Sequence, residues 1–146
     1  MDNLYRLLYT LQASMFHLFQ KTWTYHFNVT GSNFPQYHEL FNTQYNTTFE
    51  EIDTIAEAIR TFEIKALGTL EQIKEDSIIE EADMTATAMK MISDLLSDNQ
   101  KIINLMLEID RESQATRQPQ ITELIGGLLL SHKKMEWMLR STLKID

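Results

Sequence analysis

The chain has 146 residues, 43% of them hydrophobic, which is enough for one domain with a buried core and too little for two. Cysteine is absent, so disulfides and thiolate metal sites are excluded, and histidines and carboxylates are the candidate metal ligands. The net charge is −8, no apolar run reaches the ~18 residues of a membrane span and a signal-peptide pattern is missing, so we expect a cytoplasmic protein without a membrane partner.

Two long amphipathic helices are predicted in the first part of the chain, because apolar residues recur at helical spacing and strand-type alternation is absent. The first helix covers residues 3–29 and ends at the turn-forming residues 30–33. The second covers residues 35–62 and begins at Pro35, since the first turn of a helix tolerates proline. These helices make up the first half of the predicted fold.

The helical pattern weakens between residues 63 and 83, where it supports one short helix over residues 70–76. Two further long helices are predicted over residues 84–111 and 120–143, on either side of a polar break. Two long helices, a crossover with a short helix and two more long helices predict an all-α four-helix bundle with one long connection. We expect this single domain to occupy residues 1–146.

The residues that could bind a metal gather on the first two helices. His26 ends the first helix, whereas the second carries two pairs, His38 with Asn42 and Asp53 with Glu57. The members of each pair are four residues apart and therefore share a face of the helix. At ~1.5 Å rise per residue the two pairs lie about 22 Å apart, so one metal ion cannot be held by both pairs of one chain.

Two copies of the second helix could solve this problem of distance. If they packed antiparallel about a two-fold axis, the His38 end of one would meet the Asp53 and Glu57 end of the other, and the site would belong to a dimer. Taken singly, a helical histidine is usually structural and an acidic pair at this spacing usually faces solvent. Spacing alone therefore leaves two alternatives open, a shared metal site and an ordinary bundle seam.

Beyond spacing, the chain resembles a known family, the Dps mini-ferritins of the ferritin-like superfamily. The signature stretch around the first turn is matched by His26-Phe27-Asn28-Val29-Thr30-Gly31, Phe34, His38, Phe41 and Tyr45, and the second stretch by Asp53-Thr54-Ile55-Ala56-Glu57-Ala58-Ile59-Arg60. Residues 66–70 are similar to the family's crossover segment, and residues 132–139 are similar to its closing helix. The likeness covers nearly the whole chain in order.

The resemblance implies a function. In this family twelve subunits form a hollow shell, and iron is oxidised, preferentially by hydrogen peroxide, at sites shared across the two-fold interface. Carried over to this chain, His26 and His38 come from one subunit and Asp53 and Glu57 from its partner. The implied activity is that of a ferroxidase that stores ferric iron and protects against oxidative damage.

One departure from the family pattern concerns the metal ligands. The usual carboxylate four residues after His38 is replaced by Asn42, whose neutral carbonyl oxygen is expected to bind a dication more weakly. A working ferroxidase with altered rate is therefore weighed against a catalytically silent shell that sequesters metal or has a structural or DNA-associated role. A plain helical interaction module, which predicts a monomer or simple dimer, ranks last.

DNA binding is expected to be weak or absent. The chain is acidic and carries no lysine-rich tail, and the basic residues Lys133, Lys134, Arg140 and Lys144 on the last helix have the spacing of a solvated face.

A few other residues carry expectations of their own. His17 and His132 are expected at the surface or an interface, not as ligands, and Trp137 is expected to pack in the core. Asp110, Glu112 and Glu123, near the turn between the third and fourth long helices, are candidates for a three-fold iron entry pore.

Overall fold

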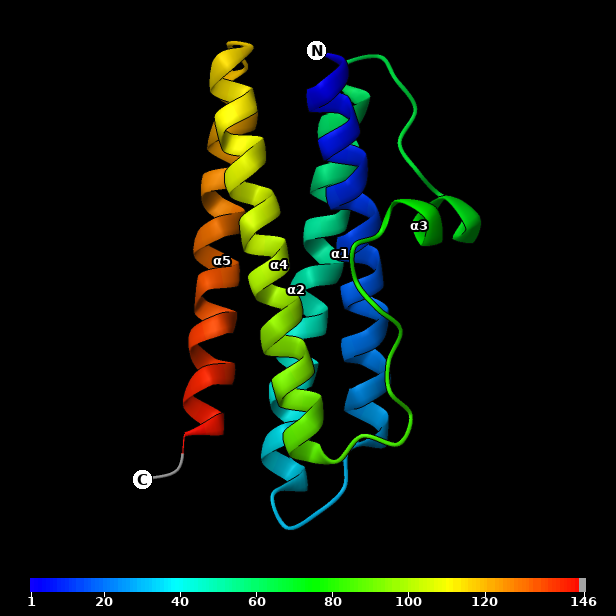
Figure 1. Cartoon of the computed structure of the whole chain (residues 1–146), viewed down its shortest axis with the longest axis vertical. Coiled ribbons are helices and arrows are strands. Elements are labelled where there is room, and N and C mark those ends of the chain that lie inside the picture. Colours follow the sequence, from blue (N-terminus) through cyan, green and yellow to red (C-terminus); the bar gives the residue numbers. More distant parts are fainter. Residues whose placement is uncertain (145–146) are drawn as a thin grey trace.

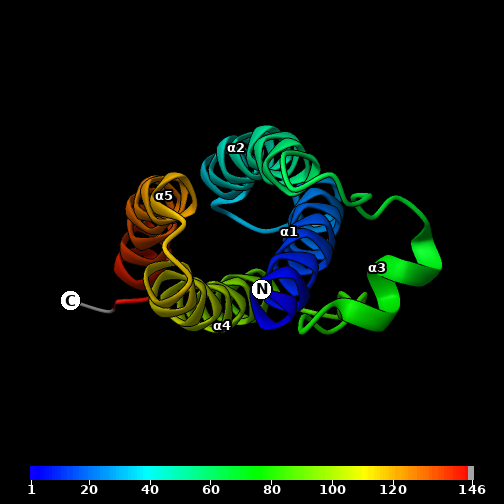
Figure 2. The same ribbon diagram turned by 90° about the horizontal axis from the view of Figure 1, so that it is seen from above.

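A computed structural model describes residues 1–144 of the protein. Within that range the chain forms α1 (Asp2–Asn28), α2 (Phe34–Arg60), α3 (Leu70–Asp76), α4 (Ala88–Ala115) and α5 (Pro119–Leu143). The two hairpins α1–α2 and α4–α5 lie side by side, and the crossover that carries α3 runs along the outside of α1 (Figure 1). Seen from above, α1 packs on α4 while α2 faces α5 (Figure 2). The predicted all-α four-helix bundle with a long connection is confirmed.

The core lies between the four long helices, because each helix turns an apolar stripe inward. On α1 this stripe reaches full burial at residues spaced three and four apart, such as Leu4, Leu8, Leu11 and Met15. The other helices contribute the remaining buried side chains, chiefly Phe41, Ile55, Ile59, Ile92, Leu95, Ile102, Met106, Ile109, Ile121, Ile125 and Leu139. No helix in the described part of the chain is both long and apolar enough to cross a membrane.

Side-chain hydrogen bonds attach the crossover to α1. Gln12 pairs with the backbone of Leu67 in both directions, donating from Nε2 to the carbonyl and accepting the amide at Oε1, each at 2.9 Å. Farther on, Ser14 Oγ accepts the Ile78 amide at 3.0 Å, and His17 Nδ1 lies 2.9 Å from Ser77 Oγ. His17 is therefore mostly covered by the crossover and is only 11% exposed.

The start of the third long helix was placed too early by the sequence prediction, which was wrong over residues 84–87. In the structure Asp83 Oδ1 accepts hydrogen bonds from the amide and hydroxyl of Thr85, which forms a turn before the helix. Thr87 then caps α4 by accepting the amide of Lys90. At its other end α4 runs on to Ala115, through the beginning of the predicted polar break.

Two side chains differ from the prediction in their burial. His132 is fully buried, because its Nδ1 is 2.9 Å from Asn99 Oδ1 on α4 and its Nε2 is 3.0 Å from Glu51 Oε1 on α2. Trp137 is 57% exposed, since Met135 and Leu139 occupy the inward positions around it on α5. The predictions that His132 lies at the surface or an interface and that Trp137 packs in the core were both wrong.

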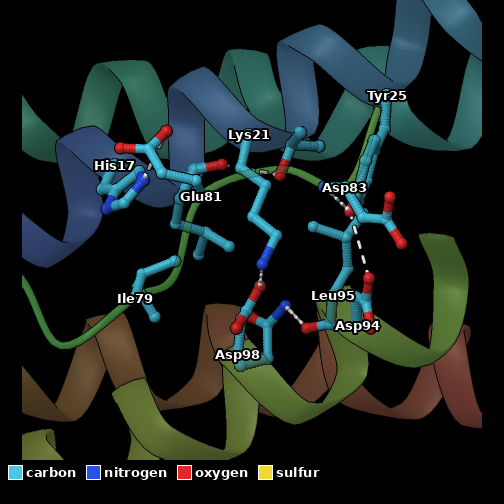
Figure 3. A network of polar contacts seen from close by, with 12 residues as sticks. His17, Lys21, Tyr25, Ile79, Glu81, Asp83, Asp94, Leu95 and Asp98 are labelled. Atoms are coloured by element: carbon cyan, nitrogen blue, oxygen red, sulfur yellow. Dashed lines mark hydrogen bonds and ion pairs between the residues drawn. The ribbon is translucent and has the colours of Figure 1, made fainter. Parts of the chain in front are cut away.

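A buried ion pair joins α1 to α4. Lys21 Nζ lies 2.9 Å from Asp98 Oδ2, and each side chain is 4% exposed (Figure 3). The next residue, Asn99, contacts His132, and His132 in turn contacts Glu51. Two sets of polar contacts, which meet at the neighbouring residues Asp98 and Asn99, thus involve all four long helices.

Tyr25 forms a second polar contact between α1 and α4. Its hydroxyl donates to Asp94 Oδ2 at 3.1 Å and accepts the backbone amide of Asp83 at 3.0 Å (Figure 3). Burial, aided by the negative charges of Asp94 and Asp83, raises the pKa of Tyr25 from 10.0 to about 12. The fold therefore favours the neutral phenol.

This pKa predicts a loss of stability in alkali. The contribution of Tyr25 is fully present below its unfolded pKa of 10.0 and is lost as the pH rises through about 12. The side chain introduced by Tyr25→Phe cannot ionise. The difference in the free energy of unfolding between wild type and this variant should therefore become smaller between these two pH values. Urea unfolding at a series of pH values measures the difference. A constant difference across that window would contradict a buried neutral phenol.

Candidate metal centre

The turn between α1 and α2 brings the two histidines together. The turn is short, and Gly31 has a φ of 119°, a conformation that side-chain-bearing residues rarely adopt. Val29, at the end of α1, is buried and its amide bonds the carbonyl of Tyr25, which fixes the exit of the chain from the helix. As a result the last turn of α1 lies against the first turns of α2.

His26 and His38 form a reciprocal pair across this turn. His26 Nδ1 lies 2.8 Å from the carbonyl oxygen of His38, and His38 Nδ1 lies 2.8 Å from the carbonyl oxygen of His26. A carbonyl oxygen only accepts, so each Nδ1 carries a hydrogen and donates it. In the neutral ring this leaves the lone pair on Nε2, which has no hydrogen-bond partner among residues 1–144. Both imidazoles are therefore held in the tautomer that binds a metal through Nε2.

Aromatic side chains surround the histidine pair. The two imidazoles are stacked with centroids 3.8 Å apart, and the rings of Phe27 and Tyr45 meet His26 edge-on at 5.2 Å. Ring contacts continue along the α1–α2 seam through Trp23, Phe19 and Phe49. His26 itself is only 7% exposed, whereas several of the outer rings are exposed, namely Trp23 (41%), Phe27 (57%) and Phe49 (58%).

Asp53 and Glu57 lie on the same helix as His38 but nearer its other end. Both are exposed, and neither has a side-chain hydrogen bond or ion pair with any residue of the described chain. Within residues 1–144 no three histidine or acidic side chains gather into a group that could hold a metal. One chain thus presents two imidazoles at one place and two carboxylates at another, and the two places are separate, as the helix spacing had predicted.

Asn42 is half-buried one turn after His38, and its amide is already engaged. Asn46 Nδ2 donates to the backbone carbonyl of Asn42 at 2.8 Å and to its side-chain Oδ1 at 3.2 Å. Sequence reasoning missed Asn46, although its position four residues after Asn42 is the signal that could have identified this contact. It also missed the continuous aromatic cluster.

The acidic residues proposed for a pore lie on both sides of the α4–α5 turn. Asp110 Oδ2 accepts a hydrogen bond from Gln114, while Glu112 is half-buried and Glu123 is exposed on the next helix. Arg117 lies in the turn itself, between these acidic residues in the sequence, and has a φ of 55°. The pore assignment remains a prediction, because it depends on contacts between three subunits.

Comparison with known proteins gives a consistent result. The family model described as "Ferritin-like domain" matches residues 5–146. The chain is 31% identical over 131 residues, 88% of its length and 73% of the relative's, to an uncharacterized low temperature-induced protein of Nostoc. It is 29% identical to DNA protection during starvation protein 2 of Bacillus anthracis, over 86% of each chain. The crystal structure of Dps from Staphylococcus aureus superimposes with a TM-score of 0.96 and 25% identity, covering 100% of this chain and 98% of that one.

Proposed function

Because the chain belongs to the ferritin-like domain family and has the Dps fold, we propose that it oxidises ferrous iron with hydrogen peroxide at sites shared by two subunits. The ferric product is stored inside a hollow dodecamer. The reaction thereby removes both ferrous iron and hydrogen peroxide, the two reagents of oxidative damage. The reciprocal pair of His26 and His38 is the observation that carries this proposal.

The histidine pair supplies the nitrogen ligands. Each ring is fixed by a hydrogen bond at Nδ1, which is the support that metal-binding histidines commonly have. Imidazole nitrogen and carboxylate oxygen together suit iron. The stacked rings are 3.8 Å apart, comparable with the ~3.5–4 Å that separates the ions of two-metal sites. Such a pair can hold two ferrous ions close together.

The carboxylates come from the second subunit. Asp53 and Glu57 of the partner subunit complete the ligand set when two α2 helices pack antiparallel, since neither carboxylate has a side-chain partner among residues 1–144 of its own chain. Three exposed rings lie beside the site, those of Trp23, Phe27 and Phe49. Their exposure favours the packing of a second copy of the chain on this face. Burying them in the dimer would also exclude bulk water from the metal.

The electron count fits two adjacent ions. Hydrogen peroxide accepts one electron from each of two ferrous ions and takes up two protons. The O–O bond breaks and two water molecules form, while both ions become ferric. A single ion per site would release a radical after the first electron, so a paired site is the arrangement that suppresses oxidative damage.

Two measurements test the proposal. Mass in solution is expected to be that of a dodecamer, and peroxide added to the ferrous-loaded protein without oxygen should oxidise two ferrous ions per peroxide. A stable monomer at micromolar concentration would remove the basis of the shared site. A dodecamer that does not consume peroxide faster than buffer would favour the silent shell, an alternative supported by Asn42 standing where a carboxylate is usual.

DNA is expected to be at most a weak partner. The basic residues Lys133, Lys134 and Arg140 lie on a chain with a net charge of −8, so phosphate repulsion should prevail without bridging cations. In a gel-retardation assay with plasmid at about 150 mM salt and no Mg²⁺, the protein should leave the plasmid unshifted. Retardation that is lost in Lys133→Glu/Lys134→Glu would show that α5 binds DNA.

A further inference from the structure

The contact between Asn42 and Asn46 determines which way both side-chain amides face. The backbone carbonyl of Asn42 can only accept, so the group of Asn46 that lies 2.8 Å from it must be the NH₂. That same NH₂ lies 3.2 Å from the side chain of Asn42, which must therefore present its carbonyl oxygen to it. The reverse orientation of Asn42 would place two NH₂ groups against each other.

We propose that Asn42 is not a metal ligand but a hydrogen-bond donor at the site, oriented by Asn46. This inference rests on the proposed function, because it assigns a role to Asn42 at the site of His38. Asn46 lies one turn after Asn42 and His38 one turn before it, so the oxygen held by Asn46 is turned away from His38. The NH₂ group of an amide has no free lone pair for a metal.

The role differs from that expected of a substituted ligand. A carbonyl oxygen in place of a carboxylate would still bind the ion, only more weakly. In the proposed site the two ions are held by His26 and His38 with Asp53 and Glu57 of the partner subunit, and the anionic ligands come from that subunit alone. The NH₂ group of Asn42 can donate a hydrogen bond to an anionic oxygen, such as a carboxylate oxygen that is not bound to the metal. Asn46 is then a positioning residue, acting through Asn42.

Equilibrium binding of Co²⁺ to the assembled protein tests the assignment without iron turnover. Asn42→Ala removes a hydrogen bond but no ligand, so it should weaken Co²⁺ binding by less than about fivefold. Asn42→Asp should bind it about tenfold more tightly or better, because it adds an anionic ligand. The absorption spectrum of bound Co²⁺ should be unchanged in Asn42→Ala and altered in Asn42→Asp. Thr43→Ala, at the exposed neighbouring position, is the matched control.

A second variant tests the part played by Asn46. Asn46→Ala frees the oxygen of Asn42 to turn toward the metal, so it should change the Co²⁺ spectrum in the presence of Asn42 and leave it unchanged in Asn42→Ala/Asn46→Ala. Equal spectra for Asn46→Ala and wild type would overturn the positioning role.

The remaining outcomes separate this inference from the proposed function. If Asn42→Ala weakens Co²⁺ binding about fivefold or more while His38→Ala abolishes it, Asn42 is a ligand and this inference is wrong, although the site stands. If His38→Ala leaves Co²⁺ binding unchanged, the metal is bound elsewhere and both proposals are overturned. Thermal unfolding of each variant confirms that the shell is intact, and these exposed or half-buried positions on α2 should tolerate the changes.

Discussion

Replacing His38 by alanine is expected to abolish peroxide-driven iron oxidation and to weaken metal binding by at least about 100-fold. The change removes one of the two nitrogen ligands and also the hydrogen bond that His38 Nδ1 donates to the carbonyl of His26. The half-buried position of His38 allows the helix to persist. Stopped-flow oxidation of ferrous iron by peroxide measures the first effect, and calorimetric titration with Co²⁺ measures the second.

The control for this prediction is a histidine outside the site. His17 packs beneath the crossover against Ser77, far along α1 from His26, so His17→Ala should lower stability and leave the oxidation rate per folded subunit unchanged. Equal losses of rate in His17→Ala and His38→Ala would mean that the effect is one of folding. Full activity in His38→Ala would contradict the ligand role directly.

Removing Asp98 is expected to destabilise the bundle by about 3–5 kcal/mol, because it leaves the ammonium group of Lys21 buried without a counter-charge. Burial raises the pKa of Asp98 even though Lys21, which opposes the shift, lies 2.9 Å away. The cost of removing this carboxylate from water therefore exceeds the attraction that Lys21 returns. Urea unfolding of wild type and Asp98→Ala at one protein concentration measures the loss, since assembly shifts apparent stability.

The same argument predicts a rescue. Lys21→Met/Asp98→Leu removes both charges and keeps apolar volume in the α1–α4 seam, so it should be as stable as wild type or more so. Comparing the two variants separates the penalty of a stranded charge from the value of the pair. If the double variant is as unstable as Asp98→Ala, the pair contributes net stability and the desolvation argument fails.

The fold was predictable because its signals are local. Helical periodicity runs along each long helix, and the short helix was placed at residues 70–76, where the structure has it. Its start is encoded nearby: Thr69 accepts the amide of Gln72, and the side chain of Gln72 bonds back to the amide of Thr69. The start of α4 was missed although the Asp83–Thr85 turn and the Thr87 cap are local signals; only the bond from the amide of Asp83 to Tyr25, 58 residues away, is long-range.

The environment of His132 could not be obtained from the sequence. Its two partners, Asn99 and Glu51, are 33 and 81 residues away and come from different helices, so the sequence does not identify them, although the spacing of Leu128, His132 and Met135 places His132 on the buried stripe of α5. A histidine flanked by Lys133 and Lys134 has the local character of a surface residue. Its place on the buried stripe of α5 outweighs that local character.

The candidate site was predictable in part. Helix spacing indicated that the His38 and Asp53 regions of one chain are too far apart to share an ion, and the structure keeps them apart. The tautomer of each histidine was not predictable, since it depends on a backbone carbonyl across the turn, 12 residues away. The resemblance to the ferritin-like family indicated which residues to expect at the candidate site, whereas only the structure gave their geometry.

The central claim is that each site is shared by two subunits, and mixing two inactive variants tests it most directly. His38→Ala keeps its carboxylates, and Asp53→Ala/Glu57→Ala keeps its histidines, so each assembled alone should be inactive. In a mixed dimer one site has lost both halves while the other is intact. Random co-assembly during expression should therefore restore peroxide-driven iron oxidation to about a quarter of the wild-type rate. A mixed shell as inactive as its two parents would contradict a site built from the histidines of one subunit and the carboxylates of the next.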